Sequence, residues 1–260
     1  MSPHFKRYIG IDYSGAETVT SSLKSLRMYE ADHLAGPREI GPPPSPRRYW
    51  TRKGVAEWLV ARLAEGPRTL VGIDHGFSFP LRYFEEHGLL HDWPLFLDDF
   101  QRHWPTDERY TYVDFVRDGN CGNAAARSGD SHWRRITEMR CHAKSVFHFN
   151  VPGQVAKSTH AGLPWLRYLR NKASGHVHFW PFEGWELPLG KSVVAEVYPA
   201  LWSHSFPRED RNSDQHDAYS IVEWMRRCDL DGTLEQYFRP RLDPREREVA
   251  EVEGWILGVV

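Results

Sequence analysis

Cysteine is scarce in this chain of 260 residues, which has only Cys121, Cys141 and Cys228. Their odd number and unpaired spacing argue against a disulfide framework and against a Cys-rich zinc site. The chain also lacks an apolar run long enough to cross a bilayer, and its first residues contain no apolar signal region. We therefore expect a cytoplasmic protein in a reducing compartment, without a membrane partner.

Internal repeats are also absent, which argues against a solenoid or an array of small units. The length and the 40% of apolar residues are sufficient for one large hydrophobic core. Regular apolar spacing weakens between about residues 80 and 160. We therefore predict a single domain over residues 1–260, with a helical or irregular insertion at about 80–160.

The spacing of apolar residues predicts an α/β protein. Pro and Gly dominate residues 34–48, which we expect to be a loop. Three strands before this loop suggest an antiparallel meander, and the later strands alternate with helices, as in parallel sheets. The sequence thus predicts a mixed sheet with helices on both faces. The expected strands are 5–12, 18–23, 26–31, 69–74 and 191–198, and the expected helices are 51–65, 81–91, 93–104, 163–172, 213–228 and one that begins at Asp243.

Acidic residues occur in apolar strands, where structure alone gives little reason for them. Asp12 ends the first strand, Asp74 ends the strand 69–74, and Glu196 lies inside an otherwise apolar strand. A carboxylate at the edge of a core needs a compensating charge or hydrogen bonds. Asp12 and Asp74 could accept turn N–H groups, and Glu196 could pair with a buried Arg or Lys or face solvent.

Asp214 and Asp217 open the amphipathic helix predicted at 213–228. Their i, i+3 spacing places them on one face, and Asp214 shares the stripe of the apolar Ala218 and Ile221. A role for Asp214 as a helix cap or as a partner of the helix dipole remains an alternative. Taken together, the five acids predict a centre for Mg²⁺ or Mn²⁺, with Asp12, Asp74, Glu196 and Asp217 as ligands and Asp214 assisting, because hard ions prefer carboxylate oxygens.

Five short motifs occur in a fixed order along most of the chain. They are Tyr8-Ile-Gly-Ile-Asp12, Val71-Gly-Ile-Asp74 with Phe79-Pro80, Ala195-Glu-Val-Tyr-Pro199, Asp214-Gln-His-Asp-Ala218 and Glu253-Gly-Trp-Ile256. In these motifs the chain resembles the domain-of-unknown-function family 429, a group of predicted ribonuclease H-like nucleases. The resemblance implies a ribonuclease H-like fold, which has the element order predicted above, and active-site roles for Asp12, Asp74, Glu196 and Asp217.

Charge is distributed unevenly along the chain. Residues 127–172 contain nine Lys or Arg and two acids, so this segment carries +7 while the rest of the chain carries −9. Such asymmetry predicts a phosphate-bearing partner, here nucleic acid, or else an ordinary solvated basic face. Aromatic residues interleave with these cations and could stack bases, although they could equally belong to the core. These aromatic residues are Trp133, Phe147, Phe149 and Trp165.

Five residues are candidate substrate contacts. Arg140, Lys144 and Lys157 of the basic segment could contact a phosphate, and Ser14 lies in the small-residue turn after Asp12. His75, directly after Asp74, could orient a ligand or carry a proton.

The function predicted from these patterns is hydrolysis of nucleic-acid phosphodiesters by a carboxylate-bound Mg²⁺ or Mn²⁺ centre. A nucleic-acid-binding module without a competent site is the non-enzymatic alternative. The Ile11-Asp-Tyr-Ser-Gly15 loop also resembles the first phosphate loop of actin-like ATPases and sugar kinases, but the chain has no second such loop. The choice between DNA and RNA and the oligomeric state stay open.

Overall fold

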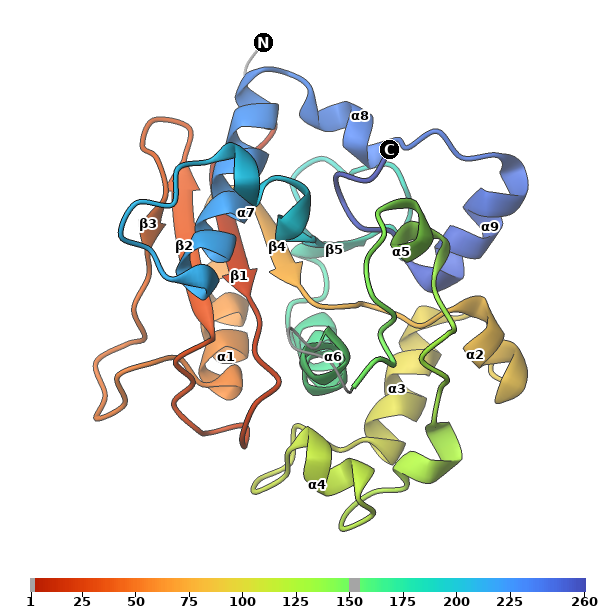
Figure 1. The fold of residues 1–260 in the computed structure, drawn as a ribbon. Coiled ribbons are helices and arrows are strands. Elements are labelled where there is room, and N and C mark those ends of the chain that lie inside the picture. Colours follow the sequence, from red (N-terminus) through yellow and green to blue (C-terminus); the bar gives the residue numbers. More distant parts are fainter. Residues whose placement is uncertain (1–2, 150–154) are drawn as a thin grey trace.

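The computed structural model describes residues 3–149 and 155–260, which contain one six-stranded mixed sheet with the strand order β3-β2-β1-β4-β6-β5 (Figure 1). β1 pairs antiparallel with β2, and β2 with β3. β1, β4, β6 and β5 run parallel to one another. The predicted α/β class and mixed sheet are therefore confirmed. The strands are β1 (Arg7–Asp12), β2 (Arg27–Asp32), β3 (Arg38–Glu39), β4 (Thr69–Asp74), β5 (Val177–Trp180) and β6 (Ser192–Glu196).

Helices cover both faces of this sheet. One core cluster joins Ile9 and Ile11 of β1 to α1, α3 and α6, and the other joins Tyr8 of β1 to α7 and α8. Alternate residues of a strand point to opposite faces, so each central strand contributes to both clusters. The helices are α1 (Arg52–Ala64), α2 (Leu81–Glu86), α3 (Trp93–His103), α4 (Val113–Arg117), α5 (Ile136–Arg140), α6 (Val155–Lys172), α7 (Ser213–Leu230), α8 (Leu234–Phe238) and α9 (Pro244–Glu253).

Two glycines let α7 lie close against the sheet. Gly10 of β1 and Gly72 of β4 are register partners. A Cβ atom on Gly10 would lie 2.7 Å from the carbonyl oxygen of Ala218, and one on Gly72 would lie 2.8 Å from Cγ2 of Ile221. Because side chains there would push the helix outward, these glycines set the distance between α7 and the two central strands.

The meander differs from its prediction in two strands. Residues 18–23 form turns, because the Thr18 hydroxyl and the Ser21 hydroxyl bond at 2.8 Å and the Ser21 N–H donates to the Thr18 carbonyl. Such local bonds compete with a strand ladder despite the β-propensity of this stretch. The third strand is instead β3, inside the stretch predicted to be a loop.

α6 begins at Val155, eight residues before the predicted start, and contains Pro164 in its interior. Pro164 has no N–H to donate to the carbonyl of His160, and such a missing bond ordinarily breaks or ends a helix. Here the Thr106 hydroxyl donates to that carbonyl at 2.7 Å, so the polar group stays satisfied inside the core. The short β5 and α8 were not predicted.

The stretch between β4 and α6 holds α2, α3, α4 and α5, joined by turns. Its Phe79, Phe96 and Phe100 belong to the same core cluster as Ile9 and Ile11. Trp93 of α3 contacts Phe179 of β5, with ring centroids 5.4 Å apart, so this stretch packs against the sheet. Across the described part of the chain, no helix combines the length and apolar character that crossing a membrane requires.

Candidate functional site

Two acids meet at the ends of the central parallel strands. Asp12 and Asp74 are the last residues of β1 and β4 and are register partners. They stand two residues after Gly10 and Gly72, so their side chains point to the face that α7 covers. Both are partly buried.

α7 brings two further acids to the same place. Asn212 caps this helix, with its side chain accepting a hydrogen bond from the Gln215 N–H at 2.9 Å. Asp214 and Asp217 follow in the first two turns, and both are half-buried. Asp214 is thus not the cap, but it lies in the first turn, where a carboxylate interacts favourably with the helix dipole.

The four acids line one open cleft of about 560 Å³. Its walls come from the ends of β1 and β4, from the first turns of α6 and α7, and from the segment after β6. The lining residues are Asp12, Tyr13, Ser14, Gly15, Ser25, Asp74, Val155, Lys157, Ser158, Tyr198, Ser213, Asp214 and Asp217.

The electrostatics of this cleft disfavour carboxylate charge. Burial raises the pKa of Asp12 well above its ordinary value, and the charges of Asp74, Asp214 and Asp217 raise it further. Burial likewise raises the pKa of Asp74, with added repulsion from Asp217 and Glu196. The pKa of Asp217 is raised mainly by burial. A bound cation would reverse these shifts, because it favours the ionised form of each acid.

The carboxylates of Asp12, Asp74 and Asp217 take part in no ion pair and no side-chain hydrogen bond within residues 3–149 and 155–260. Over the same residues, no three His, Cys, Asp or Glu side chains already stand as a metal-binding group. The donor set nevertheless fits a hard divalent ion, since it offers carboxylate and hydroxyl oxygens in an open cleft.

A buried arginine fixes the loop after Asp12. The guanidinium of Arg52 donates to the carbonyls of Ser14, Ala16 and Glu17, at 3.2, 2.5 and 2.7 Å. On the other side of the loop, a Cβ on Gly15 would lie 2.2 Å from the carbonyl oxygen of Lys157. The loop is therefore clamped between α1 and the first turn of α6.

Glu196 does not reach this cleft, contrary to its predicted role as a metal ligand. It is the register partner of Ile73, one residue before Asp74, so its side chain points to the opposite face of the sheet. There the Arg135 Nη1 and Nη2 atoms donate to both carboxylate oxygens at 2.7 and 2.5 Å, and the Phe77 N–H donates at 2.9 Å. The structure thus shows the alternative, a pair with a buried arginine.

Arg135 is the centre of a buried cluster of acids, which we call the Arg135 hub: Arg135, Glu138, Glu196 and Glu253. All four residues are at most 4% exposed. Burial alone would lower the pKa of Arg135, but the charges of Glu196 and Glu138 outweigh it and raise this pKa. Glu253 accepts the N–H groups of Leu81 and Ile136, both at 2.7 Å. The hub therefore ties α2, α5, α9 and β6 together.

Of the five predicted substrate contacts, two line the cleft and three do not. Ser14 and Lys157 line the cleft, and the Lys157 ammonium lies 2.5 Å from Asp114 Oδ2. His75 is buried and does not line the cleft, and burial lowers its pKa to about 4. Arg140 pairs with Glu246 at 2.6 Å. Neither Arg140 nor Lys144 lines the cleft.

Most of the basic segment 127–172 is neutralised by acids, all but one from outside the segment. At least six of its nine cations form ion pairs with described residues, and the carbonyls of Glu138 and Ala143 accept hydrogen bonds from Arg134. Its aromatic residues are core residues or pack against the core. This segment is thus a poor candidate for a phosphate-binding face. The six pairs are Arg127–Asp99, Arg135–Glu138 and Glu196, Arg140–Glu246, Lys157–Asp114, Arg167–Asp98 and Arg170–Glu183.

Sequence reasoning did not assign seven of the residues that line the cleft, among them Ser25 and Tyr198, which carry hydroxyl groups. Burial, Cys141 and the charges of Asp74 and Asp217 raise the pKa of Tyr198, so its hydroxyl remains protonated beside the acids. Tyr198 belongs to the motif Ala195-Glu-Val-Tyr-Pro199, but strand alternation would place it on the same face as Glu196, away from the cleft. It reaches the cleft because β6 ends at Glu196, which sequence spacing does not reveal. Ser25 has no sequence signal either.

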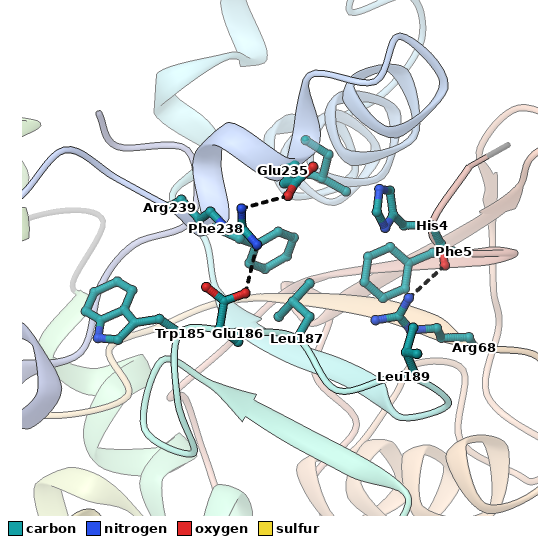
Figure 2. A pocket seen from close by; sticks show the side chains of 11 residues that line it. His4, Phe5, Arg68, Trp185, Glu186, Leu187, Leu189, Glu235, Phe238 and Arg239 are labelled. Carbon is teal, nitrogen blue, oxygen red and sulfur yellow. Dashed lines mark hydrogen bonds and ion pairs between the residues drawn. The ribbon is translucent and has the colours of Figure 1, made fainter. Parts of the chain in front are cut away.

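A small cavity of about 140 Å³ lies at the opposite ends of β1 and β4, beside Phe5 and Arg68 (Figure 2). Its charged groups already have partners. Arg239 pairs with Glu186 at 2.8 Å and with Glu235 at 3.1 Å, and Arg68 donates to the His4 carbonyl at 3.2 Å. This cavity holds no cluster of unpaired acids and is not the candidate site.

Comparison of the chain with protein-family models, with curated proteins and with solved structures found no match. The family resemblance therefore rests on the short motifs alone.

Proposed function

We propose that this protein is a metal-dependent phosphodiester hydrolase, a nuclease that uses Mg²⁺ or Mn²⁺. One observation carries the proposal: the carboxylates of Asp12, Asp74, Asp214 and Asp217 share a cleft in which Asp12, Asp74 and Asp217 have no cationic partner among the described residues. A protein retains such repulsion at a functional site, where a ligand supplies the missing charge.

The sheet supports a ribonuclease H-like fold, which the motifs imply. Its β3-β2-β1 part is antiparallel, β4 and β6 are parallel to β1, and the acids end β1 and β4. A fold of this kind hosts more than one activity, so the function is argued from the cleft.

Asp12, Asp74 and Asp217 would hold the metal, with Asp214 assisting. The bound ion would supply a water of lowered pKa and neutralise charge that develops on the phosphate. Ser14 would contact the phosphate, and Lys157, which lines the same cleft, would do so only by leaving its ion pair with Asp114. Glu196 is a positioning residue in this scheme, because it fixes the turn after Asp74 through the Phe77 N–H.

The test is cleavage of labelled single-stranded, duplex and branched DNA and RNA in Mg²⁺, Mn²⁺ or EDTA. We expect metal-dependent cleavage that falls about 100-fold or more in Asp12→Asn and Asp217→Asn, because each removes charge that binds the ion. The matched control is Asp231→Asn, an exposed acid at the other end of α7. It should retain full activity.

Three results would overturn the proposal. Cleavage that persists in EDTA or in both variants would remove the metal site. Nucleic-acid binding without cleavage in any metal would favour the non-catalytic module. ATP hydrolysis without nuclease activity would favour the phosphate-loop alternative.

A further inference from the structure

A second cleft, of about 330 Å³, lies directly beside the acidic one. Ser25 and Asp214 line the acidic cleft, and their chain neighbours Leu26 and Gln215 line the second. The two clefts thus share a boundary at the start of β2 and in the first turn of α7. The second cleft is lined by Leu26, Arg27, Glu39, Ile40, Gly41, Pro42, Arg48, Tyr49, Trp50 and Gln215.

Tyr49 forms a fixed aromatic wall of this second cleft. Its backbone N–H donates to the Ser22 hydroxyl at 3.0 Å, and that hydroxyl donates to the Tyr49 carbonyl at 3.3 Å. The next residue, Trp50, is buried and donates its indole N–H to the Ile40 carbonyl at 2.7 Å. Tyr49 itself is only half-buried, although the backbone that carries its ring is held on both sides.

Arg27 lies against this ring, with its Cζ atom 4.8 Å from the ring centroid. Glu39 holds Arg27 through an ion pair of 2.9 Å and accepts a hydrogen bond from the Gln215 amide at 2.7 Å. The acid of this wall is therefore already bonded, and it couples the aromatic wall to the helix turn that carries Asp214.

Cations border the second cleft on the Pro-rich loop. Arg47 and Arg48 are exposed, and within the described ranges neither has an acidic partner. Arg48 lies over the Tyr49 ring at 5.3 Å. Because no ion pair with a described residue holds Arg48, it can turn to a phosphate at little electrostatic cost, unlike the paired cations of the segment 127–172.

We propose that the second cleft binds an unpaired nucleobase next to the phosphodiester that lies in the acidic cleft. Tyr49 stacks on the base, and Arg48 contacts the flanking phosphate. A base must leave its duplex to stack on a side chain, so the substrate is single-stranded at this position. The inference rests on the proposed function and names its substrate class.

The test measures binding, so it does not need turnover. Fluorescence anisotropy would follow labelled single-stranded and duplex oligonucleotides, as DNA and as RNA, in Ca²⁺ over a range of salt concentrations. We expect tighter binding of single strands. Tyr49→Ala should weaken it about 10-fold, because one stacked base is lost. Tyr49→Phe should keep close to wild-type affinity.

Arg48→Ala should lower the magnitude of the slope of log affinity against log salt by about 0.7, the change for one phosphate contact on a single strand. Arg245→Ala, an exposed arginine on α9, is the matched control and should leave the slope unchanged. No oligonucleotide binding by the wild type, or binding insensitive to Tyr49→Ala and Arg48→Ala, would overturn the inference.

The two proposals fail in different ways. If Asp12→Asn abolishes cleavage but Tyr49→Ala leaves oligonucleotide binding unchanged, only the proposal of base binding in the second cleft is overturned. Binding that depends on Tyr49, without cleavage in any metal, would overturn the hydrolase and retain the base-binding cleft.

Discussion

The acidic cleft and the Arg135 hub both gather carboxylates, but they compensate them differently. In the hub, Glu196 and Glu138 share one buried guanidinium, and Glu253 accepts two backbone N–H groups. In the cleft, Asp12, Asp74 and Asp217 stand close enough to repel one another, and no cation of the described chain pairs with them. The acids of the hub are therefore compensated within the protein, whereas Asp12, Asp74 and Asp217 have no ion-pair partner among the described residues.

Removal of the hub's central cation should have the largest effect. Arg135→Met leaves buried acids without their partner, and we expect the free energy of unfolding to fall by about 3–5 kcal/mol. Urea denaturation measures it. Arg140→Met removes a partly exposed pair with Glu246 and should lose less than about 1 kcal/mol. Equal losses in the two variants would show that the hub is not a structural centre.

The approach of α7 to the sheet should have the next largest effect. Gly10→Ala places a Cβ against the backbone of Ala218, so the helix must shift, and overpacking costs about 1–3 kcal/mol. The shift should also weaken Mn²⁺ binding, measured by calorimetry, because Asp217 moves with the helix. Gly36→Ala meets open space and is the control. If Gly10→Ala leaves the Mn²⁺ affinity unchanged, the geometry of the cleft does not depend on how closely α7 packs against the sheet.

Relief of the repulsion among the cleft carboxylates should have the smallest effect on stability. Unlike the two changes above, it should raise the free energy of unfolding. The pKa of Asp12 is raised in the folded state, so its protonated form stabilises the fold at low pH. That stability is lost as pH rises through the folded pKa. Asp12→Asn should therefore raise the free energy of unfolding by about 1 kcal/mol at neutral pH in EDTA.

Thermal melts of Asp12→Asn measure this gain at neutral and acidic pH. We expect the gain to shrink at acidic pH, and Mn²⁺ to stabilise the wild type more than the variant. Glu248→Gln changes an exposed acid and is the control. It should alter neither the stability at either pH nor the stabilisation by Mn²⁺. A destabilised Asp12→Asn in EDTA would mean that Asp12 has a structural partner after all.

Much of the fold could be predicted because its signals are local. The apolar runs before Asp12 and Asp74 fix β1 and β4, and Thr51 and Asp243 mark the starts of α1 and α9. The turn within residues 18–23 could not be predicted, because it depends on the hydrogen bond between the Thr18 and Ser21 hydroxyls. The full length of α6 could not be predicted either, because the Thr106 hydroxyl bonds the carbonyl that Pro164 leaves without its helical partner.

Three parts of the cleft are already determined by the sequence. A strand that ends in an acid fixes Asp12 and Asp74, and helical periodicity fixes the shared face of Asp214 and Asp217. Only the tertiary structure decided the place of Glu196, because a shift of one residue in strand register moves a side chain to the other face of the sheet. It also decided the state of the basic segment, whose cations meet acids distant in sequence.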